Sequence, residues 1–270
     1  MSTPIAKGCV QMDNDVRTRF EQYLHAVTDR LSIDPRVIGL VGMGSTAERH
    51  RVDEWSDHDL AIVTLPGHQE ALRHDRSWLP DAEHLVLDVI EWHGGGKLVF
   101  DDGRVVEFGV ATPDELAGWS VHHHDVLLDR GGVADAVARA VARSPRNAEA
   151  DLASTLAIVV AHTHIGAGKA ARGEGLAAST GLRGDAVTAL LTAVAIISAA
   201  DARADYLDPR RRVEQTHPEV ARALAEAMRL DELALARRLL EITEQLMGDR
   251  PEFPRAAVDA VRRRHGWSVA

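Results

Sequence analysis

The chain has 270 residues, enough for one large domain or two ordinary ones, with 41 acidic and 31 basic side chains and a formal net charge of −10. Its acidic balance argues against a nucleic-acid groove, which usually carries a basic stripe, and its single cysteine, Cys9, excludes an internal disulfide. The N-terminus lacks the apolar core of a signal peptide and no run approaches membrane-spanning length, so we expect a cytoplasmic protein without membrane contact.

The first part of the chain mixes helical and strand-like patterns. Apolar residues at helical spacing predict a helix over 14–32, followed by a strand over 38–43 and a short helix from Ser45. A second strand begins at Asp57 and ends at Thr64, before a break at 66–67. A helical piece at 68–74 then precedes strands over 85–92, 97–100 and 104–110, and the Asp-Asp-Gly break at 101–103 predicts a hairpin.

After residue 113 the strand pattern stops and Ala- and Leu-rich helical periodicity takes over. The predicted helices span 114–118, 131–143, 148–172, 184–204, 217–229, 231–247 and 254–264. We therefore expect an α+β domain over residues 1–120 and an all-helical domain over 121–270.

A Gly-Ser turn follows the first predicted strand. Gly42 and Gly44 allow a tight turn with close backbone approach, and Ser45 and Thr46 can cap a following helix and offer hydroxyls to a phosphate. On its own such a motif is more often an ordinary turn.

Two carboxylates open the next strand. Asp57 and Asp59 are two residues apart, so their side chains share one face, and their mutual repulsion would be relieved by a divalent cation. Oxygen-only ligands suit magnesium, which takes the rest of its coordination shell from waters and substrate phosphates. Solvated acids are the alternative, but the Gly-Ser turn and the acid pair together predict a site for a metal-bound nucleoside triphosphate.

A third acid would complete such a site. Glu107 lies on the face of its strand opposite an apolar face and beside the small Gly109, so it would look across at the acid pair if the two strands are neighbours. Asp88 is the alternative third acid, whereas Asp101 and Asp102 are explained by turn chemistry.

These residues carry a resemblance to a known family. Gly44-Ser45, Asp57-x-Asp59 and the segment 102–108, which holds Glu107, resemble the core of nucleotidyltransferases of the DNA polymerase β superfamily. Within it the chain is most similar to lincosamide nucleotidyltransferases and more distantly to aminoglycoside adenylyltransferases. One departure is that no glycine follows in the stretch 46–50.

The second half adds to the likeness. The stretch 169–174, with Lys169 and Arg172, is similar to a lysine–Arg-Gly-Glu stretch of the lincosamide group, and 208–219 resembles helical domains of related transferases. The resemblance implies a polymerase β-like domain with a mixed sheet, followed by a helical bundle that contributes to the acceptor site.

The resemblance also implies a mechanism. Asp57 and Asp59 would bind Mg²⁺ carrying an NTP, with ATP as the expected co-substrate, and Glu107 would be a further metal ligand and the general base toward an acceptor hydroxyl. The turn at Gly44 and Ser45 would hold the phosphates, and Lys169 and Arg172 are candidates for the departing pyrophosphate.

The expected acceptor is a small hydroxyl-bearing antibiotic. Lincosamides are favoured by the resemblance, and aminoglycosides remain open because an acidic protein suits a polycation. Two other functions are alternatives: a protein-modifying nucleotidyltransferase of a toxin–antitoxin pair, and a non-catalytic nucleotide-binding regulator. The apolar helices would permit a homodimer.

Overall fold

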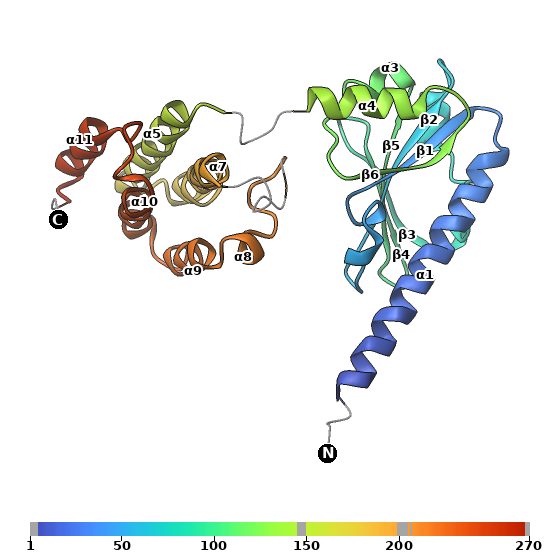
Figure 1. Cartoon of the computed structure of the whole chain (residues 1–270), viewed down its shortest axis with the longest axis horizontal. Coiled ribbons are helices and arrows are strands. Elements are labelled where there is room, and N and C mark those ends of the chain that lie inside the picture. Colours follow the sequence, from blue (N-terminus) through green and yellow to red (C-terminus); the bar gives the residue numbers. More distant parts are fainter. Residues whose placement is uncertain (1–4, 145–149, 199–204, 206, 268–270) are drawn as a thin grey trace. The chain divides into compact units, whose positions relative to one another are not determined.

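The computed structural model describes residues 5–144, 150–198, 205 and 207–267. The chain divides into two compact units, Met1–Ser144 and Pro145–Ala270 (Figure 1). The first unit holds a six-stranded mixed sheet with helices, so the predicted α+β class and the mixed sheet are confirmed.

The sheet is mixed because one of its pairings is parallel. The spatial order is β3-β4-β5-β2-β1-β6, and only the central pair β2 and β5 runs parallel while the other neighbours are antiparallel. The strands are β1 (Val37–Met43), β2 (His58–Thr64), β3 (Leu85–Ile90), β4 (Gly96–Phe100), β5 (Val105–Ala111) and β6 (His124–Asp129).

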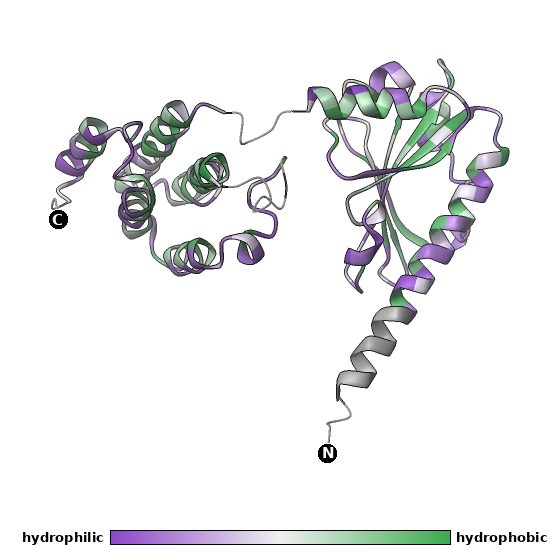
Figure 2. Cartoon of the chain, viewed as in Figure 1, coloured by the Kyte–Doolittle hydropathy of each residue, from purple (hydrophilic) through white to green (hydrophobic). Residues whose placement is uncertain are grey.

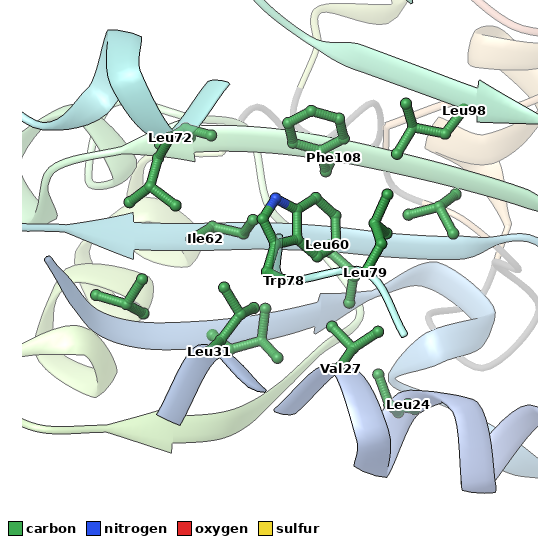
Figure 3. Close-up of a cluster of buried hydrophobic side chains, with 14 of the residues drawn as sticks. Leu24, Val27, Leu31, Leu60, Ile62, Leu72, Trp78, Leu79, Leu98 and Phe108 are labelled. Carbon is green, nitrogen blue, oxygen red and sulfur yellow. The ribbon is translucent and has the colours of Figure 1, made fainter. Parts of the chain in front are cut away.

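One face of the sheet is covered by the long helix α1 (Ile5–Ile33) (Figure 1). Figure 3 shows Val27 and Leu31 of this helix packed against Leu60 and Ile62 of β2, and all four side chains are fully buried. Leu72 joins the same cluster from the short helix α2 (Gln69–His74). Burial of these large apolar side chains is the main stabilising contribution on this face.

The opposite face is covered by α3 (Pro113–Leu116) and α4 (Val133–Arg143). Ala61 and Val63 of β2 are buried there with Leu116 and Val133. The middle of β2 is therefore apolar on both faces. Figure 2 shows the central strands mainly in the hydrophobic colour, whereas the coloured part of α1 carries both colours.

Strand β6 corrects two predictions. Strand pattern was expected to end before residue 114 and the first domain to end at 120, but β6 pairs with β1 and the first unit extends to Ser144. Helix α4 then packs its buried Val133 and Val137 on the same unit. The apolar run 126–128 is only three residues long and is flanked by histidines at 122–124 and aspartates at 125 and 129. Such a short run shows no clear strand periodicity, so the strand was not predicted.

The regular elements described in the second unit are helices. They are α5 (Leu152–Ala171), α6 (Gly175–Thr180), a π-helical turn (Gly181–Ala186), α7 (Val187–Ile197), α8 (Val213–Thr216), α9 (Pro218–Ala227), α10 (Glu232–Met247) and α11 (Arg255–His265). The predicted helix over 184–204 thus begins earlier, at Gly175, and its end at 199–204, like residues 148–149 of the preceding one, lies outside the described residues.

The helical run Gly175–Ile197 changes one further prediction. By length and composition alone it could cross a membrane, although no run was expected to approach that length. Its Leu182, Leu190 and Leu191 are buried against other helices of the unit, and a core helix of a soluble protein has the same composition. Packing within the unit therefore accounts for these three leucines, whereas Leu176 at the start of the run is 89% exposed.

Candidate functional site

The Gly-Ser turn lies directly beside one carboxylate of the acid pair. After β1 the chain makes a single 3₁₀ turn, Gly44–Thr46, in which Gly44 has a φ of 55°. A β-carbon at Gly44 would come within 3.5 Å of the Asp59 carboxylate, so this backbone borders the acid closely. The positive φ and the close approach explain why glycine suits this position.

The two hydroxyls after Gly44 have roles other than the predicted helix cap. Thr46 is fully buried, and its Oγ1 accepts a hydrogen bond of 2.9 Å from the Asp59 amide. Thr46 and Ser45 also donate to the Asp57 carbonyl, at 3.5 and 3.4 Å. The hydroxyls thus fix the turn to the start of β2, and only the half-buried Ser45 retains access toward a phosphate.

Asp59 and Glu107 lie opposite each other in adjacent strands. The parallel pairing of β2 with β5 aligns Asp59 with Glu107, and the next pairing aligns Glu107 with Lys97 of β4. Opposite residues share a face, so the three side chains form one row across the sheet. Asp57 lies one residue before β2. The pairing of β2 with β5 thus meets the condition on which the expected approach of Glu107 to Asp59 depended.

Lys97 is the residue of this row that the sequence argument missed. Its Nζ lies 2.5 Å from Glu107 Oε1 and 3.7 Å from Glu91 Oε2. The hydrogen bond to Glu107 is the main reason that the pKa of Lys97 is raised. The sequence places Lys97 at the start of the predicted strand 97–100. Its contact with Glu107 depends on the register between strands, which the sequence does not reveal.

The other candidate acids lie elsewhere. Asp88 is aligned through Leu98 with Val106, which belongs to the core under α1, so Asp88 lies on the opposite face from Glu107. There its carboxylate forms a two-point ion pair with Arg76, at 2.7 and 2.8 Å. Asp88 is therefore excluded as the acid beside Asp59.

The two aspartates of the hairpin have local partners. Asp101 lies 3.0 Å from His84, and Asp102 pairs at 2.7 Å with Arg104 two residues on. The Asp102 carboxylate also accepts a 3.0 Å hydrogen bond from the Arg104 amide, which agrees with the expected turn role of Asp102, whereas the Asp101 contact lies outside the turn.

A cavity of about 470 Å³ opens beside the two aligned acids. Asp59 and Glu107 line one part of it, and Glu91 and His93 of the β3–β4 connection line another. Trp119 lines it too, and its ring packs so closely on Gly109 that any β-carbon there would overlap it. A glycine two residues from Glu107 thus admits an aromatic surface next to the acid.

His58, between the two aspartates, points to the other face of the sheet. It is 2% exposed, and its ring stacks on Phe20 of α1 with centroids 3.8 Å apart. Nε2 lies 3.1 Å from the Phe20 carbonyl, while the buried Nδ1 has no hydrogen-bond partner among the residues that the structure describes. Burial lowers the pKa of His58 to about 4. A neutral imidazole therefore ties β2 to α1 directly behind the acid pair.

No protein-family model matches the chain, and no curated protein matches it significantly. The case for a function therefore rests on the geometry above and on the sequence motifs.

The predicted phosphate cations lie in the second unit. Lys169 is in the last turn of α5, and Arg172 follows it and pairs with Glu174 at 2.9 Å. Both occupy the helix C-terminus, where the helix dipole favours basic side chains.

The donor set at the acid pair fits a hard cation. Among the described residues, no group of three or more His, Cys, Asp or Glu side chains is arranged to hold a metal ion by itself. Asp57 and Asp59 contribute carboxylate oxygens, and Glu107 is held by Lys97. Two carboxylates beside an open turn suit Mg²⁺, which keeps waters and uses substrate phosphates rather than an all-protein cage.

Proposed function

We propose that the chain is a magnesium-dependent nucleotidyltransferase of the polymerase β-like type. It would transfer a nucleoside monophosphate from an NTP, with ATP expected, to a hydroxyl of a small antibiotic such as a lincosamide or an aminoglycoside. The observation that carries the proposal is the alignment of Glu107 with Asp59 on adjacent central strands, next to the Gly44 turn.

The acid pair and the turn would bind the nucleotide. Asp57 and Asp59 would hold Mg²⁺, which when bound neutralises triphosphate charge and supports the departure of pyrophosphate. Ser45 and the backbone of the turn at Gly44 would contact phosphate oxygens, since turn amides and a hydroxyl are suitable donors.

Glu107 would act on the acceptor. Its carboxylate takes the proton of the acceptor hydroxyl while that oxygen forms a bond to the α-phosphorus and the bond from the α-phosphorus to the β-phosphate oxygen breaks. The products are the nucleotidylated acceptor and pyrophosphate. The cavity beside Glu107, with Trp119 on its wall, offers the acceptor an aromatic surface and acidic neighbours, which suit a ring-containing cation.

The test is pyrophosphate release from each NTP with magnesium, against a panel of lincosamides and aminoglycosides. Release that requires one antibiotic should fall by about 10²–10⁴-fold in Glu107→Gln, the range expected for loss of a general base, while nucleotide binding persists. Asp57→Asn should abolish release.

Asp88→Asn is the matched control, because it changes an acid of the same sheet on the other face. Equal loss in Asp88→Asn and Glu107→Gln would refute the assigned base. If no antibiotic of the panel supports pyrophosphate release although the nucleotide still binds, an antibiotic acceptor would be contradicted and a protein substrate favoured.

A further inference from the structure

Lys97 places a positive charge among the carboxylates of the candidate metal site. Its Nζ is 2.5 Å from Glu107 Oε1, and the nearby Asp57 also contributes to the raised pKa of this lysine. An ammonium there offsets part of the repulsion among these acids. The same charge opposes the arrival of a divalent cation at those acids.

A second partner for Lys97 lies within reach. Glu91 Oε2 is 3.7 Å from Nζ, on the connection that leaves β3. The side chains of Lys97, Glu91 and Glu107 are each 36–37% exposed. Ion pairs at such exposure contribute little net stability, so Lys97 can exchange one carboxylate for the other at low cost.

We propose that Lys97 is a positioning residue. Its ammonium pairs with the Glu107 carboxylate while the site holds no divalent cation, and it pairs with the Glu91 carboxylate instead when a cation binds. The inference rests on the metal site of the proposed function. It assigns Glu91 a role as well: this carboxylate receives the displaced ammonium and so favours cation binding through Lys97 rather than as a ligand.

The test is direct binding of Mn²⁺ to the full chain, measured by electron paramagnetic resonance without nucleotide or acceptor. Lys97→Met should bind Mn²⁺ at least about threefold more tightly, since it deletes one competing charge in a partly exposed site. Lys97→Arg keeps the charge and should remain within about twofold of wild type, as expected when charge rather than shape decides.

Glu91 separates the exchange from a general charge effect. Glu91→Gln should weaken Mn²⁺ binding in the wild-type background and have no effect in the Lys97→Met background, because its role requires the ammonium. An equal loss in both backgrounds would overturn the exchange. So would unchanged Mn²⁺ affinity in Lys97→Met.

The metal site itself is tested separately in the same titration. Asp57→Asn should weaken Mn²⁺ binding strongly whatever residue occupies position 97. Retention of Mn²⁺ affinity in Asp57→Asn would refute the metal site of the proposed function. Loss in Asp57→Asn together with no change in Lys97→Met would refute only the role of Lys97.

Discussion

The buried imidazole behind the acid pair predicts a measurable loss of stability in mild acid. His58 is neutral in the folded protein: Nε2–H donates to the Phe20 carbonyl, and Nδ1 is buried without an acceptor that a proton there would need. The pKa is lowered from 6.5 to about 4, so the folded state resists protonation that the unfolded state accepts. Stability from this group is therefore present above pH 6.5 and is lost as the pH falls toward 4.

The size of the effect follows from the two pKa values of His58. At 1.36 kcal/mol per pH unit, a fall from 6.5 to about 4 corresponds to about 3 kcal/mol of unfolding free energy. Since small domains are stable by about 5–15 kcal/mol, this one group should matter to the sheet unit.

The pH dependence of the unfolding free energy is measured by urea unfolding at a series of pH values from 7.5 to 4, with tryptophan fluorescence as the signal. His58→Phe removes the buried titrating group while keeping a ring against Phe20. Below pH 6.5 its stability should fall less steeply than that of wild type, by up to about 1.4 kcal/mol per pH unit. His25→Phe removes an exposed imidazole of α1, the helix that carries Phe20, and serves as the control. Identical slopes for wild type and His58→Phe would refute the buried neutral imidazole.

Substitutions at three further positions test the surroundings of the acids. Gly109→Ala should displace the Trp119 ring and lower the unfolding free energy by about 1–3 kcal/mol, read by denaturant titration and by a changed Trp119 fluorescence spectrum. Thr46→Val should cost about 1–3 kcal/mol because the Asp59 amide loses the acceptor that the buried Thr46 provides, and Thr46→Ser, which keeps the hydroxyl, should recover most of it. Asp88→Asn should cost at most about 1 kcal/mol, as an exposed ion pair does, and leave pyrophosphate release within about twofold of wild type.

The sequence was most informative where side-chain periodicity coincides with secondary structure. Alternation placed Asp59 and His58 on opposite faces of β2, and the burial of His58 under α1 agrees with it. The same reasoning put Glu107 opposite its apolar neighbours in β5, and Val106 and Phe108 do belong to the core under α1. These assignments need only one strand at a time.

Contacts that depend on the pairing between strands could not be predicted from the sequence. Lys97 was not recognised because its contact with Glu107 arises from the β4–β5 register. Asp88 stayed open as the third acid for the same reason, until its alignment with Leu98 placed it on the other face. The edge strand β6 was missed because its short apolar run is flanked by histidines and aspartates, which resemble a polar connection.

Strand β5 shows how this unit separates its site from its stability. Phe108 points into the core, where it contacts Trp78, and its ring occupies the space that any β-carbon at Gly96 would need. Glu107, the residue before Phe108, points to the other face and is partly exposed. Core packing on one face thus fixes the backbone that presents the acid on the other. A change at Glu107 should therefore alter chemistry with little loss of stability, whereas Gly96→Ala should displace the Phe108 ring and lower the unfolding free energy by about 1–3 kcal/mol.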